Sequence, residues 1–120
     1  EEIHFDYSLW YLRRESRERL KTVIDVMKNN PGMIIEIGTH TDIRGNGGYN
    51  KDLSQKRADS AKEFLVKNGI ASDRIVSKGY GESKPIVVCL TEDACSEEDH
   101  EWNRRCEFVV VGWDYDSKKP

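Results

Sequence analysis

The sequence predicts an α+β domain, an α/β sandwich with the element order β-α-β-α-β-β and a mixed sheet that carries its helices on one face. Two long segments with apolar residues at helical spacing point to this fold, as do the short β-branched segments that alternate with them. The chain has 120 residues, which suffices for one domain with a modest core and one sheet layer. Alternating strands and helices favour some parallel pairing within that sheet.

The N-terminal half contains two predicted strands and one helix. In residues 2–6, apolar and polar side chains alternate, which indicates a short strand. Residues 9–29 form a predicted helix that ends at an Asn-Asn-Pro-Gly segment. Residues 33–39 read Met-Ile-Ile-Glu-Ile-Gly-Thr and indicate a buried strand. The apolar stripe of the helix consists of Leu12, Leu20, Val23, Ile24 and Met27.

The C-terminal half begins with a glycine-rich loop over residues 40–49 and a second amphipathic helix over 50–68. Gly69 follows this helix and suits a left-handed cap. Strands are predicted at 73–79 and 104–111, with a long loop at 80–103 between them. We expect residues 1–112 to form the domain and 113–120 a tail. The core side chains of the second helix are predicted to be Leu53, Ala61, Phe64 and Leu65.

Composition narrows the possible partners. The formal net charge is −3 and the pI about 5.6, which argues against nucleic acid as a partner because that function needs a strongly basic face. Apolar runs stay far below the roughly 18 residues that span a bilayer, so direct membrane insertion by this domain is not expected. The chain starts at Glu1 without Met, and we expect export or anchoring signals to lie outside it.

The three cysteines are Cys89, Cys95 and Cys106. Cys89 and Cys95 flank a short polar loop, so a disulfide forms if the compartment is oxidising, and three reduced thiols remain the alternative. Their spacing does not match zinc-site motifs, and the nearest histidine, His100, lies in a charged loop. We therefore expect no metal site and no cofactor.

Charged residues near one predicted strand end are the candidate binding groups. Asp42 follows the strand at 33–39, and ligands of α/β sheets bind at such ends, although an Asp there also commonly caps a turn. Arg57 lies seven residues after Asn50, about two helical turns, so both can share one helix face. A solvated Arg57 is the alternative. Arg104 and Arg105 should point to opposite faces of their strand, so that one can face the ligand edge while the other is solvated. Two ordinary surface arginines are the alternative.

Asp42 and Arg57 together offer an anion and a cation on consecutive elements. A zwitterionic amino-acid head would satisfy both, and each charge-assisted bond could contribute about 1.5–3 kcal/mol in a partly desolvated cleft. Two such contacts predict a weak site, with a dissociation constant of about micromolar to millimolar.

A longer ordered pattern resembles the OmpA-like C-terminal domain family. The matching residues run in order along nearly the whole chain: Phe5-Asp6, Thr41-Asp42, Gly45, Tyr49-Asn50, Leu53-Ser54, Arg57-Ala58, Leu65, Gly69-Ile70, Arg74-Ile75, Gly79-Tyr80-Gly81-Glu82, Pro85 and Asn103-Arg104-Arg105. The resemblance implies the fold predicted above and non-covalent binding of the diaminopimelate residue in the peptide stem of peptidoglycan.

The resemblance also implies roles for single residues. Asp42 would take the ammonium of diaminopimelate and Arg57 its carboxylate, helped by Asn50 and by backbone amides around 43–45. Asp6, Arg104 and Arg105 are weaker candidates for the same site. The resemblance further implies a periplasmic location within an outer-membrane-associated protein, possible envelope-protein partners, and an anchoring role in an outer-membrane or secretion assembly. Porins, lipoproteins, flagellar stators and secretion subunits carry such domains.

The segment 87–102 departs from the family pattern through its acidic residues and the Cys89/Cys95 pair. One alternative function is therefore a protein-interaction module whose acidic residues 92–101 dock a basic partner, although such charge is more often plain solvation. A cell-wall hydrolase is a second alternative. Hydrolase motifs such as HExxH and GxSxG are missing from the sequence, so we predict a binding protein and not an enzyme.

Overall fold

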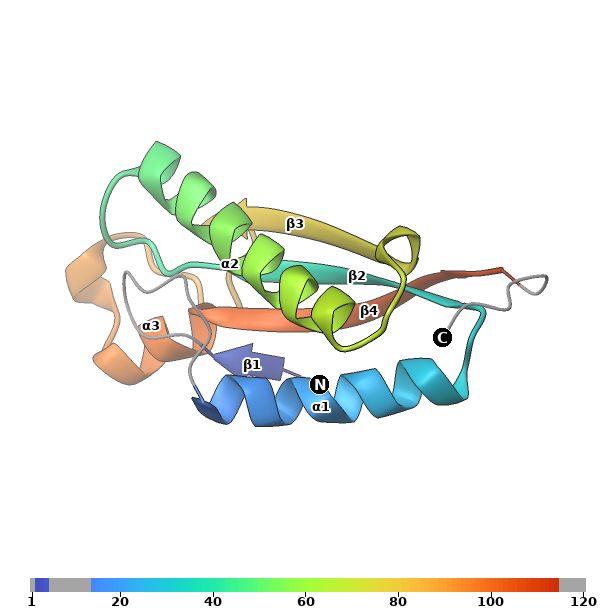
Figure 1. The fold of residues 1–120 in the computed structure, drawn as a ribbon. Helices are drawn as coiled ribbons and strands as arrows, with labels where there is room; N and C mark the ends of the chain where they lie inside the picture. The colour runs from blue at the N-terminus through green and yellow to red at the C-terminus, as the bar shows by residue number, and fades with distance from the viewer. Residues whose placement is uncertain (1, 5–13, 115–120) are drawn as a thin grey trace.

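The computed structural model describes residues 2–4 and 14–114, with side chains from residue 18 onwards. Strands and helices alternate along most of the chain (Figure 1). The helices and strands are β1 (Glu2–His4), α1 (Arg14–Asn29), β2 (Met33–His40), α2 (Gly47–Lys67), β3 (Ile75–Gly81), α3 (Glu97–Asn103) and β4 (Arg105–Trp113). Short 3₁₀ turns occupy Ser72–Arg74 and Glu92–Ala94.

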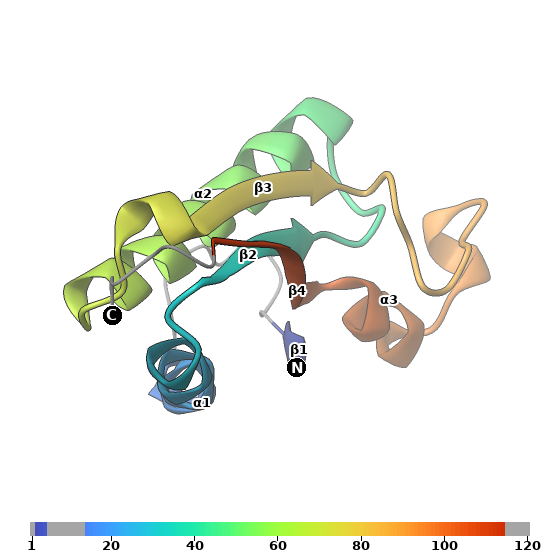
Figure 2. The same cartoon turned by 90° about the vertical axis from the view of Figure 1, so that its right-hand side faces the viewer.

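The sheet is mixed, as predicted. Its four strands lie in the order β1-β4-β2-β3, with β2 and β3 parallel and the other two pairs antiparallel. The long helices α1 and α2 cover the same face, which is the face towards the viewer in Figure 1. Figure 2 shows the same elements turned by 90°, with α1 seen nearly end on. The core between the layers contains Leu20, Val23, Ile24, Met27, Met33, Ile35, Ile37, Ala61, Leu65, Ile70, Ile75 and Cys106.

The predicted apolar stripes form this core wherever the structure describes them. Leu53 of α2 is buried, and Phe64 of the same helix packs partly buried against the cluster. Cys106 is fully buried and acts as a small core residue. The predicted core residue Leu12 lies outside the described residues, as does the Phe5-Asp6 motif with its binding candidate Asp6.

Helix α2 lies very close to β3 because Gly79 has no side chain. A Cβ atom on Gly79 would lie 2.2 Å from the Gln55 backbone nitrogen and 2.5 Å from Ser54 Oγ. The Ser54 hydroxyl instead accepts a 2.9 Å hydrogen bond from the Gly81 amide, and the Thr39 hydroxyl donates to the Ser54 carbonyl. These bonds fix the start of α2 over the ends of β2 and β3.

The ends of the elements differ from the prediction by a few residues, for local reasons. Helix α2 begins at Gly47 because the Asn46 side chain caps it, accepting from the amides of Gly48 and Tyr49 at 2.8 and 3.1 Å. The predicted cap at Gly69 is confirmed by its φ of 97°. Strand β3 begins at residue 75 because the preceding residues form a 3₁₀ turn.

The prediction of a continuous loop over residues 80–103 is wrong. Residues 92–94 form a 3₁₀ turn and residues 97–103 form α3. A reciprocal capping box starts this helix: the Asp99 amide donates to Ser96 Oγ at 3.2 Å, and the Ser96 amide donates to the Asp99 carboxylate at 3.1 Å. The helix is short and polar, so it lacks the apolar periodicity from which the longer helices were predicted.

Candidate functional site

The candidate site lies where β2 and β3 end and β4 begins, at the left of Figure 1. Asp42 comes two residues after the end of β2, and the Thr41 amide is held by the Gly81 carbonyl at 2.9 Å. The side chain of Asp42 is almost fully buried, with 1% of its surface exposed. The sequence placed this carboxylate at the strand end, and the structure agrees.

Asp42 binds two arginines. Its Oδ1 atom accepts the Arg44 amide at 2.9 Å, which is the turn-capping bond that the sequence offered as an alternative. Its Oδ2 atom accepts Arg44 Nη2 at 2.7 Å and Arg104 Nη1 at 2.9 Å. Burial alone would raise the pKa of Asp42, but the hydrogen bonds from Arg44 and Arg104 outweigh it and lower that pKa. The carboxylate is therefore ionised at neutral pH.

Glu97 of α3 completes this cluster. Its Oε2 atom lies 2.7 Å from Arg44 Nη1, and its Oε1 atom lies 3.2 Å from Arg104 Nη2. The hydrogen bond from Arg44 lowers the pKa of Glu97. Sequence reasoning missed Arg44 and Glu97 as members of the site. Arg44 could have been found from its position two residues after Asp42. Glu97 could not, because it lies 53 residues after Arg44 in the chain.

Asn50 shapes the loop around Asp42. Its amide nitrogen donates to the carbonyls of Asp42 and Arg44 at 3.3 and 3.0 Å, and to Glu82 Oε1 at 3.3 Å. The residue is 1% exposed. In this structure Asn50 therefore holds the backbone of residues 42–44 in place, and Glu82 supports Asn50.

Arg57 lies on the buried side of α2, as does Asn50. The shared helix face predicted from their spacing is thus confirmed. Arg57 has no exposed surface, which contradicts the alternative of a solvated helix arginine. Asp42 is buried as well. Their assignment as ligand-binding groups stays a prediction.

Arg104 and Arg105 point to different surroundings, as expected from alternation, but neither is solvated. Arg104 is 6% exposed and contacts Asp42, whereas Arg105 is 5% exposed. Arg105 donates to the Glu107 carboxylate and to the carbonyls of Asn103 and Lys84. The predicted solvated arginine is therefore wrong, because main-chain and carboxylate acceptors surround Arg105.

Arg105 belongs to a second polar group on the helix-free face of the sheet. A pocket of about 170 Å³ there is lined by Arg105, His40, Tyr80, Lys84 and Glu107, among others. The His40 and Tyr80 rings stack, with centroids 5.0 Å apart and planes at 6°. Burial, with a smaller contribution from the positive charge of Arg105, lowers the pKa of His40 to about 4. His40 is therefore neutral at pH 7.

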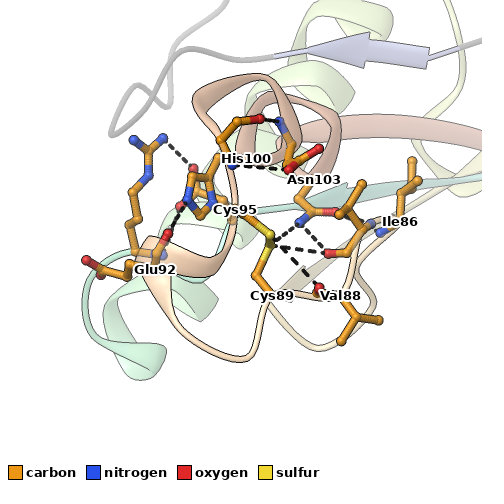
Figure 3. The surroundings of a disulfide bond; sticks show 12 residues. Ile86, Val88, Cys89, Glu92, Cys95, His100 and Asn103 are labelled. Atoms are coloured by element: carbon orange, nitrogen blue, oxygen red, sulfur yellow. Dashed lines mark hydrogen bonds and ion pairs between the residues drawn. A yellow bond between two sulfur atoms is a disulfide. The ribbon is translucent and has the colours of Figure 1, made fainter.

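A disulfide joins Cys89 and Cys95 (Figure 3). It lies within residues 86–97, the stapled segment, whose last residue is Glu97. The sequence left open a disulfide between these two cysteines or reduced thiols, and the structure contains the disulfide. His100 Nε2 lies 3.0 Å from the Glu92 carbonyl oxygen, and Asn103 Oδ1 accepts the amides of Ile86 and Val87 at 2.8 and 2.9 Å. Residues 86–87 and residue 92 are thus both held to α3.

Within residues 2–4 and 14–114, His, Cys, Asp and Glu side chains do not gather in a group of three or more that could hold a metal ion. The helices of this part of the chain are too short or too polar to cross a membrane.

Comparison with known proteins identifies the family. A model described as the OmpA family matches residues 4–98 of the chain. The chain belongs to the OmpA family. This OmpA-family domain is 38% identical over 109 residues to outer membrane porin F of Pseudomonas fluorescens, and 30% identical over 110 residues to the peptidoglycan-associated lipoprotein of Brucella melitensis. These matches cover 91% and 92% of the domain.

The domain spans 32% of the porin and 62% of the lipoprotein. Its fold matches the crystal structure of the peptidoglycan-associated lipoprotein from Burkholderia pseudomallei with a TM-score of 0.82 and 25% identity. That match covers 92% of the domain and 89% of the lipoprotein chain. The resemblance inferred from the sequence motifs and the predicted α+β fold are therefore confirmed.

Proposed function

We propose that this OmpA-family domain binds peptidoglycan non-covalently, through the diaminopimelate residue of the stem peptide. The observation that carries the proposal is the buried Asp42 carboxylate, which its two arginine partners keep ionised at the carboxyl end of β2. A family relative 30% identical to it is named a peptidoglycan-associated lipoprotein, which supports the same function. In this function the domain lies in the periplasm and anchors a larger outer-membrane-associated or secretion-system protein to the cell wall.

The chemistry of the ligand fits an anion and a cation in one site. The side chain of diaminopimelate ends in a carbon that carries both an ammonium and a carboxylate. Asp42 takes the ammonium and Arg57 the carboxylate, while Asn50 keeps the loop at 42–44 in shape. Each charge-assisted bond contributes about 1.5–3 kcal/mol when water is excluded. Both side chains are buried, so binding requires a local rearrangement that admits the ligand head.

The alternative of a protein-interaction module at residues 92–101 is less well supported. Glu97 binds Arg44 and Arg104, and Glu92 Oε1 accepts the Gly45 amide at 3.3 Å. Asp99 accepts the Ser96 amide as well, so three of the acidic side chains in this segment already bond within the domain. Plain solvation accounts for the acidic side chains that remain exposed.

A sedimentation experiment with purified cell-wall sacculi tests the proposed function. Asp42→Asn removes the charge from the site, whereas Asp52→Asn removes the same charge from an exposed position on α2. We expect Asp52→Asn to sediment with the wall like the parent and Asp42→Asn to stay in solution. Circular dichroism must show that both variants are folded. If folded Asp42→Asn sediments as well as the parent does, the site assignment is wrong.

A matched pair of soluble stem peptides tests the choice of diaminopimelate. One peptide carries diaminopimelate at its third position, and the other carries lysine, which keeps the ammonium but lacks the adjacent carboxylate. We expect the first peptide to shift the amide resonances around Asp42 and Arg57 at about micromolar to millimolar concentration, and the second to bind at least roughly tenfold more weakly. Equal affinity for the two peptides would show that the domain does not recognise the zwitterionic head of diaminopimelate.

A further inference from the structure

Four charged side chains at the end of β2 form a closed ring. Arg44 bridges Asp42 and Glu97, with both N–O distances at 2.7 Å. Arg104 bridges the same two carboxylates at 2.9 and 3.2 Å. Each arginine therefore contacts both acids, and each acid contacts both arginines.

The ring has a buried half and an exposed half. The side chains of Asp42 and Arg104 are 1% and 7% exposed, whereas those of Arg44 and Glu97 are 24% and 65% exposed. Exposed ion pairs contribute little to stability because solvent screens them. The Arg44–Glu97 half is therefore easier to move than the buried Asp42–Arg104 half.

Arg44 occupies the position that a ligand cation would need. Its Nη2 atom lies on Asp42 Oδ2, the carboxylate oxygen that faces away from the capped turn. Oδ2 already accepts hydrogen bonds from both Arg44 and Arg104, so an ammonium that binds there must replace one of the two guanidinium groups, and Arg44 is the more exposed of them. Glu97 holds Arg44 in this position through its opposite Nη1 atom.

The segment that carries Glu97 is itself firmly placed. Cys95 of the disulfide comes two residues before Glu97, and the Ser96 capping box fixes the first turn of α3. The Gly45 amide donates to Glu92 Oε1 at 3.3 Å, which ties the same segment to the loop that contains Arg44. The stapled segment thus brings Glu97 to Arg44 from a distant part of the chain.

We propose that Arg44 is an internal competitor for the ligand ammonium at Asp42, and that Glu97 is the latch that holds Arg44 there. The proposal rests on the function proposed above and adds a determinant of its affinity. Ligand binding requires Arg44 to leave Asp42, which opens the buried carboxylate. The Arg44–Glu97 pair makes the domain bind more weakly than Asp42 and Arg57 alone would allow.

Binding of the diaminopimelate-containing stem peptide to three variants, measured by calorimetry, tests this proposal. Arg44→Gln removes the competitor, and we expect roughly tenfold tighter binding than in the parent. Glu97→Gln weakens the latch, and we expect roughly threefold tighter binding than in Glu98→Gln. Glu98→Gln is the matched control because it removes the same charge from an exposed neighbour on α3.

The outcomes separate this proposal from the proposed function. If the parent binds the peptide and Arg44→Gln binds it equally or more weakly, the competitor role is wrong while the function stands. If Glu97→Gln and Glu98→Gln bind alike, Glu97 is not the latch. If neither the parent nor any variant binds, the proposed function fails and the competitor role falls with it. Thermal unfolding of each variant verifies that it is folded.

Discussion

The two ends of the sheet each bury an arginine, but the partners of the two arginines differ. At one end, Arg74 is 3% exposed and donates to three main-chain carbonyls: Nε to Met33 at 3.0 Å, and Nη2 to Met27 and Asn30 at 2.8 Å each. At the other end, Arg104 donates to the carboxylates of Asp42 and Glu97. One arginine thus binds the backbone, and the other binds side chains.

The difference separates a structural end from the end that carries the proposed binding site, which we call the functional end. The carbonyls around Arg74 belong to the end of α1 and the turn into β2, so they cannot leave Arg74 without unfolding that turn. Glu97 can leave Arg104 by rotating an exposed side chain. Burial lowers the pKa of Arg74, with Asp73 acting in the opposite direction. We therefore expect mutations at the first end to change stability and those at the second to change binding.

The largest expected effect is the loss of Arg74. Arg74→Met leaves the three carbonyls without their charged donor, and we expect the free energy of unfolding to fall by about 3–4 kcal/mol. Urea denaturation measures the change. Lys56→Met serves as the control, because Lys56 is exposed on α2, and it should stay within about 0.5 kcal/mol of the parent. A loss of less than about 1 kcal/mol in Arg74→Met would contradict the structural role.

The contrast between the two ends also explains what the sequence could predict. Long apolar periods predict α1, α2 and β2, because burial of one face fixes those elements. Helix α3 has no such period, and only the Ser96–Asp99 capping pattern marks its start. A search for that pattern would have found α3.

The candidate site divides in the same way. The position of Asp42 just after β2 was predictable because it follows a β-branched strand segment, whereas its binding role stays a prediction. The contact between Arg44 and Glu97 was not predictable from the sequence, because it depends on how the stapled segment folds back across the site. The exposed fraction of Arg57 was likewise not predictable. Helical spacing gives the face of the helix on which a side chain lies, but not what covers that face.

The second prediction concerns the disulfide at the functional end. Replacing both Cys89 and Cys95 by Ser frees a loop with a sequence separation of 6, and chain entropy predicts a local loss of about 2 kcal/mol. The Ile86 and Val87 amides, which donate to Asn103 Oδ1, should then exchange with solvent about 30-fold faster. Hydrogen exchange by NMR measures this rate.

The amide of Ile37 in the centre of β2 is the internal control for that experiment, because Ile37 belongs to the core shared by both helices. Its exchange should change much less than that of Ile86 and Val87. Equal acceleration at all three amides would mean that the disulfide stabilises the whole domain, and the division into two ends would be lost.

The smallest expected effect is a pH dependence that arises at the functional end. His40 is buried between Tyr80 and β4, and it faces Arg105, Glu107, Lys84 and Glu36. Burial lowers the pKa of His40 from 6.5 to about 4, so between these values the unfolded chain binds a proton that the folded chain does not. Protonation therefore favours unfolding, and stability falls as the pH drops from about 6.5 towards 4.

Urea denaturation at pH 7 and pH 5 measures this effect. We expect the parent to lose about 1–2 kcal/mol between the two values because of His40. His40→Asn cannot take up the proton and should lose that much less, so the difference between the two proteins isolates His40 from other titrating groups. Arg74 does not titrate in this range, so Arg74→Met should keep the pH dependence of the parent. If the His40→Asn variant showed the same loss as the parent, the pH dependence would have to arise outside the group around His40.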